Sequence, residues 1–177
     1  MHDKIDVPAS IRKRRVIYKD SLPAKALDFG LYAMLVLFPL YGASLFFLLD
    51  LKRADLSIVS WLVLVAACGF SLLLLRRTLQ VSELREYPAG TDCRNRVREL
   101  VERKGWAKMR DTNSLLVARI RPGSWLSWDD HMIVIYLGDK VLLNAASYGR
   151  FGLRSPVHVA KCRDMSDRFA AEISASP

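Results

Sequence analysis

Two acidic residues and a histidine stand next to one another in the C-terminal half of this 177-residue chain, as Asp129, Asp130 and His131. A histidine beside carboxylates can act as a general base or as a metal ligand. The same residues also fit a solvated turn, in which the acids accept hydrogen bonds from backbone amides. Neither a third metal ligand at a recognisable spacing nor a nucleophile motif accompanies them. They are our only catalytic candidates, and we expect that the protein is not an enzyme.

A second pair with metal-ligand chemistry is formed by His158 and Cys162. The two residues are four positions apart and would share one face of a helix, which is half of a zinc site. The sequence offers no partner half, and it contains no glycine-rich phosphate loop. The three cysteines form no CxxC pair, which is typical of a reducing compartment rather than of a disulfide framework. We therefore expect neither a metal nor another cofactor.

Aromatic residues, glycines and arginines gather in two predicted loops of the same half. The first loop covers 121–128 and reads RPGSWLSW, and the second covers 148–154 and reads YGRFGLR. Tryptophan, tyrosine and arginine supply much of the binding energy of protein interfaces. A tryptophan in a loop can instead fold under a sheet or dip into the interfacial region of a bilayer. We expect these loops to bind a protein partner through Arg121, Trp125, Tyr148, Arg150 and Phe151.

The two tryptophans of the first loop are expected to differ. Trp128 is followed closely by an apolar strand, and we expect its ring in the core, whereas Trp125 follows a glycine and a serine and should be exposed. For the second loop, 148–154, stacking of nucleic-acid bases is the less favoured alternative, because a nearby anionic membrane would repel nucleic acid.

Two long apolar segments come before this half and must position it. Residues 29–49 and 56–75 contain no charged residue. A helix of 21 residues is roughly 31 Å long, which matches the hydrocarbon core of a bilayer. The alternative is a pair of buried helices in a soluble bundle, but such cores rarely use helices that are apolar on all sides. A cleaved signal peptide would begin earlier and be shorter. We therefore predict a transmembrane hairpin over 28–76.

The distribution of basic residues predicts the orientation of this hairpin. The chain has 27 Lys and Arg against 18 Asp and Glu, a net charge of +9. Basic residues are numerous in the tail of residues 1–27 and after the second apolar segment, and sparse in the turn between the segments. The positive-inside rule then places both termini in the cytoplasm. We expect a multi-pass protein of the inner (plasma) membrane of a bacterium.

A basic cluster in the N-terminal tail lies close to the first apolar segment. Anionic headgroups create a negative potential at the membrane surface, which attracts basic residues at about 1 kcal/mol each. A nucleic-acid or nuclear-targeting role is the competing interpretation of such a cluster. Because of the predicted anchor, we expect contact with anionic lipids through Arg12, Lys13, Arg14 and Arg15.

The remaining chain, 91–177, is predicted to be a small α+β cytoplasmic domain, with 77–90 as a linker or an extension of the second helix. Apolar residues at helical spacing predict a helix over 92–104. Runs of β-branched residues then predict an antiparallel meander of three or four strands, with a two-residue turn at Gly138-Asp139. A last helix covers 164–173. Residues 155–163 fit either its early start or an edge strand, and we favour the helix.

Three functions fit this organisation. The first is a membrane-anchored, non-enzymatic interaction protein, whose cytoplasmic domain binds another membrane or membrane-associated protein. It would be an accessory subunit of a membrane complex or an inhibitor of the immunity-protein type. The second is an enzyme that acts on a lipid or another substrate near the membrane, and the third is a sensor of anionic lipids. We favour the first, because the domain has arginine and tryptophan in its loops but lacks a reactive constellation.

Overall fold

The computed structural model of the chain describes residues 5–19, 22–52, 58–90, 92–122, 128–148 and 154–175. The chain divides into two compact units, which are described separately. Asp20–Leu79 is called the helical unit, and Met1–Lys19 together with Gln80–Pro177 is called the sheet unit. The two flanks of the helical unit, far apart in sequence, therefore belong to one folded body.

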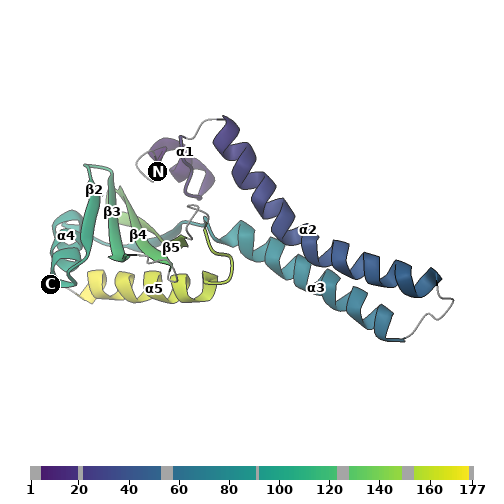
Figure 1. The fold of residues 1–177 in the computed structure, drawn as a ribbon. Helices are drawn as coiled ribbons and strands as arrows, with labels where there is room; N and C mark the ends of the chain where they lie inside the picture. Colours follow the sequence, from purple (N-terminus) through teal and green to yellow (C-terminus); the bar gives the residue numbers. More distant parts are fainter. Residues whose placement is uncertain are drawn as a thin grey trace. The chain divides into compact units, whose positions relative to one another are not determined.

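The helical unit consists of α2 (Leu22–Lys52) and α3 (Ile58–Gln80) (Figure 1). Both contain a stretch that is long and apolar enough to cross a membrane, Tyr32–Leu51 in α2 and Ile58–Thr78 in α3. The predicted apolar helices are thus confirmed; α2 extends beyond its predicted bounds at both ends and α3 at its C-terminal end, and the predicted start of the second segment, residues 56 and 57, lies outside the described residues. Pro39 lies inside α2, where it removes a backbone donor, and α2 changes direction along its length (Figure 1).

Contacts between α2 and α3 join the two helices into a hairpin. The hydroxyl of Ser71 donates to the backbone carbonyl oxygen of Val36 over 2.9 Å. The rings of Phe47 and Trp61 meet edge to face, with 5.0 Å between their centroids. Small side chains such as Ala43 are buried between the helices, whereas most of the large apolar side chains point outward and are exposed.

The sheet unit is built on five antiparallel strands in the order β1-β5-β4-β3-β2. Their bounds are β1 (Arg85–Pro88), β2 (Ala107–Asp111), β3 (Leu115–Arg121), β4 (Asp129–Leu137) and β5 (Lys140–Tyr148). The predicted meander of β3, β4 and β5 is confirmed, including the tight turn, in which Gly138 has a positive φ of 61°. The two edge strands β1 and β2 were not predicted, and β1 replaces the expected helical end of the linker.

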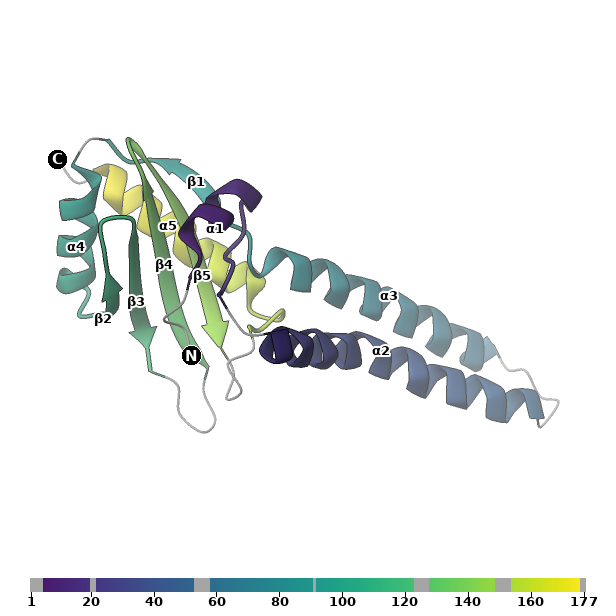
Figure 2. The same ribbon diagram turned by 90° about the horizontal axis from the view of Figure 1, so that it is seen from above.

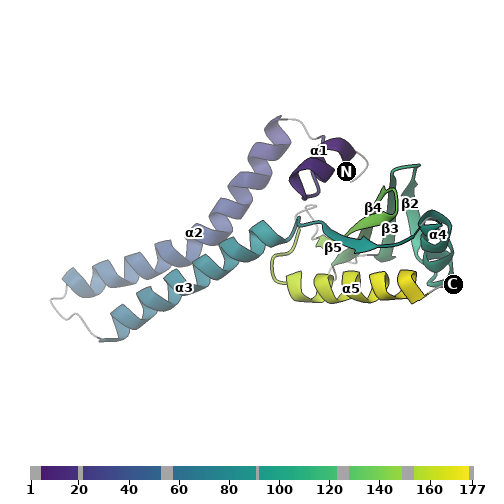
Figure 3. The ribbon, with the colours of Figure 1, turned by 180° about the vertical axis from the view of Figure 1, so that it is seen from behind.

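Two helices cover one face of this sheet, α4 (Cys93–Arg103) and α5 (Val159–Ala175) (Figure 2). Strand alternation turns Met132 and Val134 toward them, and these residues share a buried cluster with Leu100 and Phe169. α5 runs along β1 and β5 (Figure 3). Of the ambiguous residues 155–163, those from Val159 onward are helical and the first four precede the helix.

The opposite face of the sheet is covered by the N-terminal segment, Ile5–Lys19, which contains α1 (Val7–Lys13) (Figure 1). Ile5 and Val16 pack into a buried cluster with Ile133 and Ile135 of β4. We predicted a basic tail here, but these residues belong to the sheet unit. The physical reason is that β4 is apolar on both sides, so that its second face also needs an apolar cover.

Backbone hydrogen bonds fix the N-terminal segment at the edge of the sheet. The amide of Val16 donates to the carbonyl oxygen of Ser82 over 2.8 Å, and the amide of Leu84 donates to the carbonyl oxygen of Arg14 over 2.9 Å. α1 itself starts at the side chain of Asp6, which accepts from the amide of Ala9 over 3.1 Å and caps the helix.

Candidate functional site

The predicted catalytic cluster lies at the start of β4, where strand alternation separates its members. Asp130 points to the α5 side, accepts a hydrogen bond from the hydroxyl of Ser147, and lies 2.7 Å from the Nζ of Lys161. Asp129 and His131 point to the opposite face of the sheet. The three residues therefore cannot act as one acid–base group.

Asp129 and His131 take part in a buried polar chain on the face that the N-terminal segment covers. Asp129 lies 2.6 Å from Nη2 of Arg119 and 3.0 Å from Nε2 of His131. Burial alone would raise the pKa of Asp129, but hydrogen bonds from these two residues hold the pKa below its usual value. The His131 ring meets the ring of Tyr148 edge to face, with 5.0 Å between centroids. The charge of Asp129 is thus paired with that of Arg119 at a partly exposed position, whereas the side chain of His131 is only 1% exposed.

The chain of contacts continues from Tyr148 to the two points where the backbone leaves the sheet unit. The hydroxyls of Tyr148 and Tyr18 are 2.5 Å apart, and burial raises the pKa of Tyr148, so that the phenol stays protonated. Nη2 of Arg154 donates to the hydroxyl of Tyr18 over 2.7 Å, and Nη1 donates to the carbonyl oxygen of Val81 over 3.3 Å. Tyr18 comes shortly before α2 and Val81 directly after α3.

A pocket opens between β1, β5 and α5. The space inside it for water-sized groups amounts to about 20 Å³, and the rest of the hollow is open to solvent. Its charged lining consists of three arginines and one carboxylate, Arg85, Arg154, Arg163 and Glu83. The uncharged polar lining comprises Gln80, Asn144 and three buried serines, Ser147, Ser155 and Ser166. No pattern in the sequence pointed to this pocket, because its arginines come from three separate segments.

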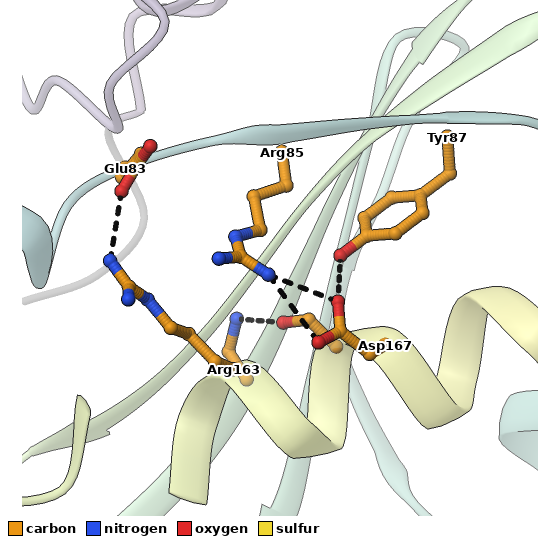
Figure 4. A network of polar contacts seen from close by, with 7 residues as sticks. Glu83, Arg85, Tyr87, Arg163 and Asp167 are labelled. Atoms are coloured by element: carbon orange, nitrogen blue, oxygen red, sulfur yellow. Dashed lines mark hydrogen bonds and ion pairs between the residues drawn. The ribbon is translucent and has the colours of Figure 1, made fainter. Parts of the chain in front are cut away.

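Two ion pairs link β1 and its approach to α5 at the edge of this pocket (Figure 4). Arg163 lies 3.3 Å from Glu83, and Arg85 lies 3.2 Å from Asp167, which also accepts a hydrogen bond from the hydroxyl of Tyr87. All four charged side chains of the two ion pairs are partly exposed to solvent. Exposed pairs of this kind contribute only about 0–1 kcal/mol to stability.

The predicted partner-binding residues have different positions. Trp125, Arg150 and Phe151 lie outside the described residues. Arg121 is exposed at the end of β3, but Tyr148 is only 3% exposed, which argues against a direct contact with a partner.

The expectation that Trp128 is a core residue was wrong. Its side chain is 40% exposed, and its ring meets the ring of His158 edge to face at 5.1 Å between centroids. The neighbour of His158, Val157, is 63% exposed. Trp128 precedes the first residue of β4, so that it lies beyond the part of the strand that the helices cover. These three residues are called the Trp128 surface.

The predicted lipid-contacting residues are all exposed, but they lie on a folded segment. Arg12 and Lys13 form the last turn of α1. Arg14 has a positive φ of 52° and pairs with Glu86, and Arg15 forms an isolated bridge with Glu83. Their contact with anionic lipids stays a prediction.

The two residues that could form half of a zinc site, His158 and Cys162, make other contacts. The Nδ1 of His158 and the hydroxyl of Ser155 are 2.7 Å apart. Cys162 is buried with its sulfur 3.6 Å from the hydroxyl of Ser147, and burial raises the pKa of its thiol. Within the described part of the chain, no group of three His, Cys, Asp or Glu residues could hold a metal ion.

Comparison of the chain with models of protein families, with curated proteins and with solved structures finds no match. The pocket, the Trp128 surface and the exposed apolar helices are therefore the features from which a function has to be argued.

Proposed function

We propose that the protein is anchored in a membrane by α2 and α3 and acts as a non-enzymatic interaction protein, whose sheet unit binds another protein. Anchoring is supported by the outward-facing apolar residues of both helices, such as Phe38, Leu62 and Val65. In water, such a surface costs about 25 cal/mol for each Å² exposed. Lipid removes this cost, and both helices have the length that a bilayer requires.

The folding of both flanks into one sheet unit supports a hairpin that enters and leaves on the same side of the membrane. Backbone hydrogen bonds such as that from Val16 to Ser82, 2.8 Å long, can form only if the two flanks share one compartment. Combined with the many basic residues of these flanks, the positive-inside rule favours the cytoplasm. We therefore propose a bacterial inner-membrane protein with both termini in the cytoplasm.

This orientation predicts the activity of topology reporters. A reporter that is active only outside the cytoplasm should be active when inserted after Arg53, between α2 and α3. The same reporter should be silent when fused after Pro177. The measurement is reporter activity normalised to the amount of fusion protein in the membrane fraction. Activity at the C-terminal fusion would contradict the cytoplasmic placement.

The choice of a protein partner rests on the Trp128 surface. Tryptophan is among the residues most enriched in interface hot spots, and Trp128 is exposed. The exposed Val157, which precedes its ring partner His158 in the sequence, adds apolar area to this surface. Because the hairpin would tether the sheet unit to the bilayer, the expected occupant is an integral membrane protein. The chain would then be an accessory subunit of that protein or an inhibitor of it, as immunity proteins are.

Site-specific photo-crosslinking in living cells tests this partner. A crosslinking amino acid at Val157 should give one defined product with an integral membrane protein. The matched position is Met109 on β2, which is also exposed but lies outside the Trp128 surface, and it should give no such product. Trp128→Ala should weaken the complex by roughly 2 kcal/mol or more and remove the Val157 product. A product with a second copy of this chain, or equal products at both positions, would contradict the proposal.

A further inference from the structure

We propose that the pocket between β1, β5 and α5 binds a phosphate group, of the kind that a phospholipid headgroup carries. This site is separate from the Trp128 surface, and its occupation by an anion does not depend on a protein partner.

The charge of the lining favours an anion. Three guanidinium groups and one carboxylate line the pocket, and after Asp167, which pairs with Arg85, is counted as well, one positive charge remains in excess. Arginine binds phosphate particularly well, because its planar fork of N–H groups matches two phosphate oxygens at once. Arg154 is buried and held in place by Tyr18 and Val81, so that one positive charge of the site is fixed before any ligand arrives.

The other two arginines can change partner at low cost. Arg163 pairs with Glu83, and Arg85 pairs with Asp167, at 3.3 and 3.2 Å. Both pairs are partly exposed, and exposed pairs are weak. A phosphate that enters the pocket can therefore compete for both guanidinium groups, whereas a tightly buried pair would resist such an exchange.

Ser166 supplies a hydrogen-bond donor inside the pocket. Its side-chain oxygen accepts from the amide of Ala145 over 3.0 Å. Within the described residues, this bond leaves the hydroxyl hydrogen of Ser166 able to donate to an anion. A neutral donor next to arginine is a common combination in phosphate recognition.

One residue of the pocket lining, Gln80, lies close along the chain to the proposed membrane segment, a step that rests on the proposed anchoring by α3. Gln80 ends α3 and lines the pocket together with Val81. The last residue of the charge-free segment is Leu75, and five helical residues separate it from Gln80 by only about 8 Å. The headgroup region extends about 5–8 Å beyond the hydrocarbon core on each side. A phospholipid is therefore the nearest abundant source of phosphate.

Binding to the purified full chain in a maltoside detergent tests the site without requiring a membrane. The probes are dihexanoyl phosphatidic acid, inorganic phosphate, and dihexanoylglycerol, which lacks phosphate. The test variant is Arg163→Gln. The matched control is Arg168→Gln on the same helix, where Arg168 pairs with Asp164 four residues earlier and does not line the pocket. Hydrogen exchange of β4 and β5 checks that each variant is folded.

We expect the wild type and Arg168→Gln to bind phosphatidic acid alike and to ignore dihexanoylglycerol. Arg163→Gln should bind it about tenfold more weakly, the effect of losing one charge-assisted hydrogen bond. Tighter binding of the lipid than of inorganic phosphate would assign the site to a headgroup, and equal affinities would assign it to free phosphate. If Arg163→Gln loses the fold, Arg85→Gln removes a second pocket arginine and carries the same expectation.

Two results would overturn the phosphate site. One is the absence of saturable binding of either phosphate probe to the wild type. The other is an equal loss of affinity in Arg163→Gln and Arg168→Gln, which would mean that the probes respond only to the overall positive charge of α5. Neither result concerns topology or the Val157 crosslink, so that failure of the pocket proposal is distinguishable from failure of the proposed function.

Discussion

Val16→Asp should destabilise the sheet unit by about 3–5 kcal/mol, the cost of an uncompensated buried charge. Val16 is 6% exposed and packs against the second face of the sheet, with Leu115, Val117 and Leu142 in the same cluster. With a carboxylate at this position, either the N-terminal segment leaves the sheet so that water can solvate the charge, or the charge stays buried without solvation. Since domains of this size are stable by only about 5–15 kcal/mol, either outcome uncovers or unfolds much of the sheet.

Hydrogen exchange of the full chain in detergent measures this effect strand by strand. In Val16→Asp, the amides of β3 and β4 should lose most of their protection. Lys19→Asp is the matched control, because Lys19 is exposed in the same segment and its replacement should change stability by no more than about 0.5 kcal/mol. Unchanged protection in Val16→Asp would mean that the N-terminal segment is a loosely attached tail, as the sequence alone suggested.

The N-terminal segment also illustrates what the sequence could and could not predict. The continuous apolar run of β4 predicts a strand that is covered on both faces, and both covers are present. The sequence does not reveal what provides the second cover, since Ile5 and Val16 stand among basic residues and are more than a hundred positions from β4. A cover formed by such distant residues is a tertiary property, which local periodicity does not encode.

The edge strands were missed for a different reason. β1 reads REYP and lacks the alternation of apolar and polar residues by which strands are recognised, whereas β2 reads AKMRD, which alternates over only four residues and contains no β-branched residue. Exposed edges commonly carry charged residues and proline, which discourage pairing with other chains. The strands with the weakest sequence signal are thus the two at the edges of the sheet.

The candidate sites differ in the same way, since some depend on local sequence and others on tertiary contacts. The apolar helices were predictable because each is defined by one uninterrupted segment. The pocket was not, because Arg85, Arg154 and Arg163 come together only after β1 pairs with β5 and α5 packs beneath them. Conversely, adjacency in sequence suggested a common role for Asp129 and Asp130, whereas in the sheet they point to opposite faces and have different partners.

Arg154→Met should destabilise the sheet unit by about 2–4 kcal/mol and should release the N-terminal segment first. Arg154 is 7% exposed, and its guanidinium lies over the rings of Tyr18 and Tyr148, 5.2 and 5.6 Å from their centroids. Methionine keeps much of the volume but removes the hydrogen bonds to Tyr18 and Val81. Hydrogen bonds from a charged donor contribute about 1.5–3 kcal/mol each, and the relief of a desolvated charge offsets part of this loss.

The order in which regions open distinguishes this connecting role of Arg154 from a general loss of packing. Because Arg154 bonds the residues on both sides of the hairpin, its replacement should raise the exchange rate of residues 5–18 and 81–84 before that of β4. Arg154→Lys should recover only part of the loss, since one ammonium group lacks the fork that reaches a hydroxyl and a carbonyl oxygen together. Phe169→Ala, in the core on the helix side, should instead expose α5 and β5 first. If Arg154→Met and Phe169→Ala open the sheet unit in the same order, Arg154 contributes only packing, and the connection between the two flanks has to depend on the backbone bonds of Val16 and Leu84.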